Sequence, residues 1–366
     1  MPKVRKNKIR QAFTVVVLIM ATLGYIVFLS AVLGQASQDF PHFVLIAVKQ
    51  FIILIGGLGL FFAVSKVPFN FWRKYALILF MTAIFVSLLT FIPGLGLEAG
   101  GARRWLIIGG LSFQPAELLK FAFVIYAAAW LTAFKYQVQT IKYGLVPLLV
   151  LIGLATGILA LQKDTGTIIV IITTGAAMFL VAGGKWRHFI LIGLFSLLLI
   201  GGLIVSRPYI MERMLTYLNP NSDLLGSSYQ INQSLIAIGS GGITGRGFGQ
   251  SVQKFSFLPQ PIGDSIFSVA AEEFGLIGAG LIIMSFIFYA LWGLKIASRA
   301  ANVFGRLLAV GLVILVISQS FINIGAMIAV FPLTGIPLIF FSQGGTALLF
   351  ALLESGIIRN IAEKSA

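Results

Sequence analysis

Ten long apolar runs decide what this chain can fold into. A membrane helix needs about 17 to 25 apolar residues, and hydrophobic residues make up 58% of the 366-residue sequence, while charged residues make up 10%. Soluble domains carry roughly 25% charged residues. The sequence therefore predicts an all-α polytopic membrane protein with about ten transmembrane helices in a single domain, residues 1–366. The predicted spans are 13–34, 43–64, 74–92, 117–133, 143–161, 166–183, 188–206, 265–294, 307–330 and 343–358. The eighth is long and the last is short, so either could be tilted or broken.

Lysine and arginine are divided unevenly between the loops on the two sides. Of the 26 such residues, 17 fall on the side of the N-terminus and seven on the other side. Because positive residues are retained in the cytoplasm, both termini are predicted to be cytoplasmic. The net charge of +15 is then explained by loops that lie beside anionic lipid headgroups, and nucleic acid is not an expected partner.

Residues 207–264, between the seventh and eighth spans, are polar and rich in glycine and predict a large extracytoplasmic loop. Most acidic residues fall on the same side. They are Asp39, Glu98, Glu117, Asp164, Glu212, Asp223 and Asp264. A carboxylate at the mouth of a membrane helix, such as Asp264, is partly desolvated, so its protonation is adjustable. Function is therefore expected at the outer face.

A metal site built from cysteine and histidine is excluded. The chain has no cysteine, and its only histidines, His42 and His188, are predicted to lie on opposite sides of the membrane. Metals with oxygen ligands, such as Mg²⁺ or Mn²⁺, remain open because carboxylates suffice for them.

Charged residues around the start of the fourth span have two interpretations. Arg103, Arg104 and Trp105 are either anchors at the membrane interface or part of a phosphate site. Glu117 and Lys120 are three residues apart on one helical face, and a structural ion pair is the favoured role. The whole stretch 96–122 reads as a glycine-containing loop that leads into a helix.

Four other segments punctuate the spans. Asp164 is either the N-cap of the next helix or a functional group. Residues 331–349 are expected to line a cavity, since irregular backbone at membrane depth needs protein or water as a partner, although a simple hairpin is the alternative. Residues 239–250 are glycine-rich but lack the preceding strand and the Lys-Ser/Thr of a nucleotide loop. Residues 227–240 have apolar residues at helical spacing and predict a short helix on the membrane surface.

Five ordered motifs cover nearly the whole chain. They are GARRWL with FQPAELLK, QKDTGT, YQINQSLIAIGSGG with GFGQSVQKF, FLPQPIGDSIFSVAAEEFGLIG, and FPLTGIPL with FFSQGGTALL. This series resembles the SEDS family of cell-wall polymerases, which includes FtsW, RodA and SpoVE, and the third motif is closer to the FtsW division branch. The resemblance implies a peptidoglycan glycosyltransferase that polymerises lipid II outside the bacterial cytoplasmic membrane, at the division septum. It also implies a class B penicillin-binding protein as partner, which crosslinks the product, and further division proteins.

The resemblance also assigns residues. The family's essential aspartate falls on Asp264, and Glu117 and Lys120 match its charged pair. Two positions depart from the pattern: Gln260 stands where the family usually has Glu, and Lys163 replaces a usual proline.

An inverting glycosyl transfer from a pyrophosphate-linked donor needs a general base and positive charge at the leaving group. Asp264 is the predicted base; its alternative role is an N-cap, and it is also a possible metal ligand. The candidates for binding the pyrophosphate are Arg103, Arg104, Lys163, Arg213, Arg246 and a divalent cation. Further cavity candidates are Asp164, Gln233 and Ser342. No organic cofactor is expected.

Two other classes of function compete with this one. A transporter or lipid flippase would also use many spans and intramembrane charges such as Glu272 and Glu273, but inverted repeats would favour it and no convincing repeat is present. If the protein were only a scaffold that recruits division proteins, its outer loops would not need a tightly specified sequence. Within the family, an elongation polymerase of the RodA type is the remaining alternative.

Overall fold

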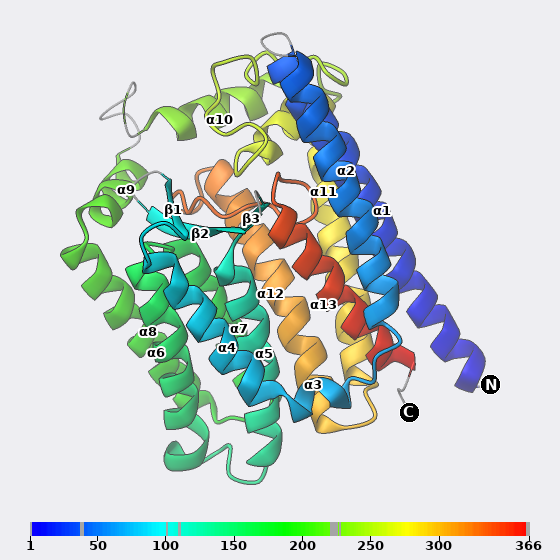
Figure 1. The fold of residues 1–366 in the computed structure, drawn as a ribbon, viewed down its shortest axis with the longest axis vertical. Helices are drawn as coiled ribbons and strands as arrows, with labels where there is room; N and C mark the ends of the chain where they lie inside the picture. Colours follow the sequence, from blue (N-terminus) through cyan, green and yellow to red (C-terminus); the bar gives the residue numbers. More distant parts are fainter. Residues whose placement is uncertain are drawn as a thin grey trace.

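The computed structural model describes residues 2–36, 40–99, 102–108, 111–219, 226 and 228–363. The chain forms a helical bundle with one small sheet (Figure 1). In chain order the elements are α1 (Pro2–Ala36), α2 (Phe40–Val64), α3 (Asn70–Lys74), α4 (Ala76–Leu88), η1 (Leu89–Phe91), β1 (Gly96–Ala99), β2 (Ala102–Ile108), β3 (Leu111–Phe113), α5 (Pro115–Ala133), η2 (Ile141–Leu145), α6 (Val146–Leu161), α7 (Thr165–Val181), α8 (Trp186–Ser206), α9 (Pro208–Leu218), α10 (Tyr229–Ser240), α11 (Ile266–Ser298), α12 (Val303–Met327) and α13 (Gly345–Glu363). Asp39 and Asp223 lie outside the described residues.

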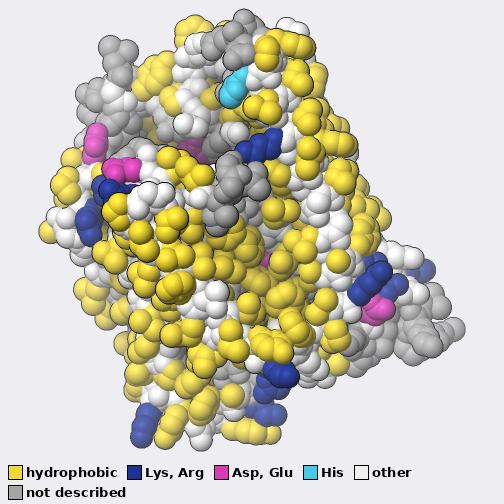
Figure 2. Space-filling model, in the orientation of Figure 1, with side chains coloured by type: hydrophobic (Ala, Val, Ile, Leu, Met, Phe, Trp, Pro, Cys, Tyr) yellow, Lys and Arg dark blue, Asp and Glu magenta, His cyan; other side chains and the backbone are white. Residues whose placement is uncertain are grey.

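All ten predicted spans coincide with helices. Within the described ranges, eight helices are long and apolar enough to cross a membrane, and the apolar helices over Ala76–Phe91 and Thr165–Val181 are shorter. Helix α12 lies inside the bundle against α5, α7 and α11, whereas α8 is exposed along most of its length. Figure 2 shows a broad hydrophobic surface across the middle of one face, as contact with lipid requires.

The two ends of the described chain meet at one end of the bundle. Arg10 near the start of α1 forms an ion pair with Glu363 at the end of α13, at 3.4 Å. Helices α9 and α10 lie at the opposite end (Figure 1). This arrangement agrees with a fold in which the 207–264 segment and the chain ends are on different sides.

The predicted 96–122 loop is wrong in part, because residues 96–99, 102–108 and 111–113 form an antiparallel sheet in the order β1-β2-β3. Leu106 of the central strand β2 pairs with Gly96 on one side and with Phe113 on the other. Short apolar runs on either side of a glycine pair are typical of a hairpin. The many polar and glycine residues of this stretch favoured a loop instead, so the strands were not predicted.

The predicted 207–264 loop contains two helices, α9 and α10. Helix α10 confirms the helix predicted over 227–240. Its face with Ile231 is buried against neighbouring helices, mainly α11, while Leu235 is exposed. The amphipathic pattern therefore serves packing on one face of this helix and leaves another apolar face open.

The long eighth predicted span is broken, as its length suggested. In α11, Gly275 has φ 64° and ψ −164°, a conformation that is essentially restricted to glycine. The backbone groups freed by the break bond to the glycine-rich loop: Arg246 N donates to Glu272 O at 3.1 Å, and Leu276 N donates to Gly242 O at 2.9 Å. Residues 239–250 are thus a backbone partner for a broken helix, and not a nucleotide loop.

Candidate active site

A cavity of about 290 Å³ lies at the end of the bundle that carries α9 and α10. Strand β2, the α6–α7 turn, α9, α10, Asp264 before α11 and the 331–344 segment all contribute to it. The lining residues are Ala102, Arg104, Lys163, Tyr209, Glu212, Arg213, Thr216, Tyr217, Gln230, Ile231, Asp264, Leu333 and Gly335. The fold therefore brings four predicted site residues, Asp264, Arg104, Lys163 and Arg213, into one cavity.

Asp264 is held from several directions. Gln230 Nε2 lies 3.2 Å from each carboxylate oxygen and 3.1 Å from Ser265 Oγ. Asn323 Nδ2 donates to the Asp264 carbonyl at 2.8 Å, and Ser342 Oγ donates to the carbonyl of the preceding residue, Gly263, at 2.6 Å. The carboxylate is therefore fixed at the wall of the cavity while its backbone is fastened to α12 and to the 331–344 segment.

The alternative role of Asp264 as an N-cap is wrong. The N-cap of α11 is Ser265, which makes no capping hydrogen bond through its side chain. Asp264 directs its carboxylate to Gln230 of α10, because the turn that begins at Gln260 places it one residue too early for the cap.

Burial raises the pKa of the Asp264 carboxyl above its ordinary value, while the hydrogen bond from Gln230 and the charge of Arg213 act in the opposite direction. The group is half-buried. A carboxylate of this kind is a better general base than a fully hydrated one, because its proton affinity lies closer to the working pH.

Three cationic side chains line the same cavity. Arg213 Nη1 donates to Leu333 O at 3.2 Å, and burial together with the nearby Arg104 lowers the pKa of Arg213; an arginine stays protonated even so. Arg104 donates to the carbonyls of Gln162 and Lys163 at the end of α6. The Lys163 ammonium lies 5.8 Å from the centre of the Tyr209 ring.

Gly335 lies between the acid and the cation. Its φ is +68°, and a Cβ there would lie 3.9 Å from both Arg213 Nη2 and Asp264 Oδ2. A glycine permits this left-handed backbone beside the two charged groups.

Two predicted pyrophosphate ligands, Arg103 and Arg246, lie outside the lining of this cavity. Arg103 is exposed and pairs with Glu98 at 3.2 Å, because successive residues of strand β2 point to opposite faces and only Arg104 faces the cavity. Arg246 pairs with Glu272 at 3.4 Å beside the break in α11.

The remaining predicted cavity residues do not line it either. Asp164 is buried and caps α7, accepting from Thr167 N at 3.2 Å, which confirms its structural interpretation. Gln233 is half-buried on α10. Ser342 acts on the backbone next to Asp264, as described above, so it supports the site from outside.

Glu117 and Lys120 form the predicted ion pair, at 2.9 Å, and both are buried. Lys120 Nζ also contacts Gln319 Oε1 of α12. The pair fastens the first turns of α5 to the centre of the bundle, away from the cavity lining.

Sequence reasoning missed several residues of the site, above all Gln230 and Asn323, and it named Glu212 only as one of the outer-face carboxylates. Gln230 lies within a quoted motif but carries no charge. Asn323 is a polar residue within an apolar span, and that signal was available.

The two departures from the family pattern have different consequences. Lys163 has φ 60°, which a proline ring forbids, so the turn here differs from one that contains proline. Gln260 has an exposed side chain, and its carbonyl accepts from Gly263 N at 2.9 Å, so its contribution to the turn is made through the backbone.

Oxygen ligands for a metal are few. Among the described residues there is no group of three or more His, Asp or Glu that could hold a metal ion. Two carboxylates, Asp264 and Glu212, line the cavity.

The fold and the cavity define a class: a polytopic helical membrane protein with a carboxylate and three cations in a cavity at one end of its bundle. A family model described as "Cell cycle protein", for FtsW, RodA and SpoVE, matches residues 10–366. The chain belongs to this family.

Individual relatives agree. The chain is 37% identical to stage V sporulation protein E of Bacillus subtilis, over 96% of both sequences. It is 34% identical to a protein of Geobacter sulfurreducens named "Probable peptidoglycan glycosyltransferase FtsW", over 97% of this chain and 96% of that protein.

Solved structures show the same fold. A structure described as the structural coordination of polymerization and crosslinking by a peptidoglycan synthase complex contains a chain with a TM-score of 0.79 and 28% identity, covering 96% of this chain and 97% of that one. The crystal structure of the rod shape determining protein RodA of Thermus thermophilus has a TM-score of 0.70 at 24% identity, covering 96% of both chains.

Proposed function

We propose that this protein polymerises lipid II into glycan strands at the outer face of the cytoplasmic membrane, with the cavity around Asp264 as its active site. The chain is a peptidoglycan glycosyltransferase, as the names of its relatives indicate. The single observation that carries the assignment of the site is the half-buried Asp264 carboxylate in a cavity that Arg104, Lys163 and Arg213 also line.

Each group has a place in an inverting transfer. Asp264 accepts the proton of the acceptor sugar hydroxyl as that oxygen forms the bond to the anomeric carbon of the donor. The bond between the anomeric carbon and the pyrophosphate oxygen breaks, and its electron pair leaves with the pyrophosphate. Arg104, Lys163 and Arg213 stabilise the charge that develops there.

A divalent cation is a second source of positive charge for the leaving group. Asp264 and Glu212 are the carboxylates of the cavity lining that would contact such an ion. Because the lining holds three cationic side chains and two carboxylates, we assign the leaving group to the three cations and the ion to a supplementary role. Activity in a chelator, with and without added Mg²⁺ or Mn²⁺, tests this assignment.

We further propose that the partner is a class B penicillin-binding protein and that the complex works at the division septum, together with other division proteins. The structural neighbour in a synthase that coordinates polymerization and crosslinking supports such a partner, and the relatives named FtsW support division. We also propose that both termini are cytoplasmic, which the distribution of Lys and Arg supports.

The decisive experiment uses the purified protein with lipid II, with and without the transpeptidase, and separates the products by length. Glycan chains that require Asp264 support the proposal. Movement of lipid II across vesicle membranes without glycan formation would instead identify a flippase, and recruitment of division proteins without either reaction would identify a scaffold.

A further inference from the structure

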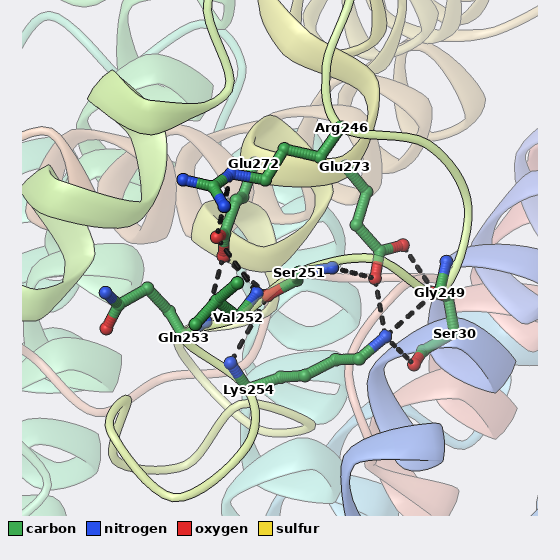
Figure 3. Close-up of polar contacts among 9 residues, drawn as sticks. All are labelled: Ser30, Arg246, Gly249, Ser251, Val252, Gln253, Lys254, Glu272 and Glu273. Atoms are coloured by element: carbon green, nitrogen blue, oxygen red, sulfur yellow. Dashed lines mark hydrogen bonds and ion pairs between the residues drawn. The ribbon is translucent and has the colours of Figure 1, made fainter.

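A second group of buried charges lies outside the cavity and has no part in the chemistry above. Lys254, Glu272 and Glu273 are all almost completely buried. They lie where the 241–263 loop, the first part of α11 and α1 meet (Figure 3). Charges in such a place are costly unless each is paired, so we traced what each one contacts.

Lys254 and Glu273 form an ion pair that includes α1. Lys254 Nζ lies 2.7 Å from Glu273 Oε1 and 3.0 Å from the Ser30 carbonyl. Ser30 Oγ donates to Glu273 Oε2 and accepts from Gly249 N, the latter at 3.0 Å. One serine of α1 therefore contacts both sides of the ion pair.

The Glu272 carboxylate binds the 241–263 loop, mainly through backbone amides of the loop. Its carboxylate accepts from Ser251 Oγ at 2.5 Å, from Val252 N at 3.0 Å and from Gln253 N at 3.3 Å. The exposed Arg246 pairs with it at 3.4 Å. Three consecutive loop residues thus bind one buried carboxylate.

The residues of the Lys254–Glu273 ion pair lie on either side of Asp264 in the sequence. Lys254 is ten residues before Asp264, and Glu273 is nine residues after it. The ion pair therefore joins the two ends of the segment 254–273, which contains Asp264 near its middle. The break at Gly275 follows directly, and there the same loop supplies the missing backbone partners: Gly247 N donates to Glu273 O at 2.9 Å.

We infer that Ser30, Ser251, Lys254, Glu272 and Glu273 form a loop clamp that positions Asp264 for the glycosyl transfer. The clamp rests on the proposed role of Asp264 as the base. None of its members lines the cavity, so they are positioning residues and act only through the segment between them. A buried ion pair specifies one arrangement of a loop more than it stabilises the fold, and misplacement of a reacting group by about 1 Å can cost roughly 10²-fold in rate.

The test is the double variant Lys254→Met/Glu273→Gln, which removes both charges together and leaves neither one buried alone. We expect a membrane-inserted protein whose amide hydrogens in residues 255–263 exchange at least about tenfold faster than in the parent. We also expect kcat with lipid II to fall by at least about tenfold while KM changes by less than about threefold. The double variant Arg10→Gln/Glu363→Gln, which removes a partly exposed ion pair at the other end of the bundle, should change neither quantity.

Ser30→Ala is the second variant, and it decides the matter if the double variant does not fold. It leaves the ion pair in place and removes only the hydroxyl on α1, so the protein should fold, with exchange in 255–263 and kcat both altered by about fivefold, the equivalent of one hydrogen bond. Parental exchange in that segment, in a folded variant, would overturn the clamp. Faster exchange with parental kcat would leave it a structural feature and overturn the positioning role.

The clamp can be tested separately from the proposed glycosyltransferase activity. If the parent protein makes no glycan, the exchange measurement still reports whether the five residues hold the segment.

Discussion

At the scale of single residues, the site depends on what surrounds one carboxylate. Asp264 contacts an amide of α10, and its backbone is bonded to α12 and the 331–344 segment. Burial raises the pKa of this group, and Gln230 and Arg213 counteract part of the rise. The group is therefore tuned by side chains that are distant from it in the sequence.

Asp264→Asn removes the base and keeps the size of the side chain. Because the variant can still accept a hydrogen bond from Gln230, we expect normal insertion and lipid II binding, with polymerisation lowered by about 10²–10⁴-fold. The rate of glycan formation by purified protein is the measurement. Glu98→Gln, at an exposed ion pair outside the cavity, is the matched control. Polymerisation at the parental rate in Asp264→Asn would reject the base assignment.

Gln230→Leu removes a hydrogen bond to the ionised carboxylate. That bond favours the charged form and lowers the pKa of Asp264, so its loss raises the pKa further. A base works in its deprotonated form, and the acid limb of the pH profile of kcat should therefore move to higher pH. Gln233→Leu, one turn further along α10 and outside the cavity lining, should leave that limb in place. An unmoved limb in Gln230→Leu would show that this contact does not tune the base.

At the scale of elements, the break in α11 is the feature on which the outer end of the bundle depends. Gly275→Ala should be severely destabilising, since a Cβ there would lie 2.4 Å from both Gly245 N and Ile243 O and the backbone conformation alone costs about 1–3 kcal/mol for other residues. Gly280→Ala, in the same helix with open space around it, is the control and should unfold at the parental temperature or above. The measurement is thermal unfolding in detergent. Equal stability of the two variants would contradict the break.

The pair Glu117–Lys120 belongs to the same scale, because it joins α5 to α12 through Gln319. Removing one partner leaves a buried charge without its partner, which costs about 3–5 kcal/mol. Glu117→Gln should thus lower the unfolding temperature, and the charge-swapped variant Glu117→Lys/Lys120→Glu should recover part of the loss. Parental stability and activity in each single variant would contradict a structural role for the pair.

At the scale of the whole molecule, helices α9 and α10, which contribute to the cavity lining, and the chain ends lie at opposite ends of the bundle (Figure 1). The cysteine-free sequence allows this polarity to be tested by single cysteines at exposed positions. Ile243→Cys should react with an impermeant reagent added outside the cell, and Tyr136→Cys only after permeabilisation; both side chains are largely exposed. Reaction of Ile243→Cys from the cytoplasmic side alone would reverse the orientation.

The sequence by itself determined the class and the positions of the long apolar helices, and it singled out Asp264 as the candidate base, because apolar length and ordered motifs are local properties. The length of the eighth predicted span also indicated that its helix could be broken, as it is at Gly275. Whether Arg103 or Arg104 faces the cavity was decided by a strand that the sequence did not reveal. The pairing of Arg246 with Glu272 depends on the break at Gly275. The contacts of Gln230 and of the Lys254–Glu273 pair were also decided by the tertiary structure. The partners of these polar side chains come from segments that are far apart in the sequence. Only the tertiary structure specifies which of those segments are in contact.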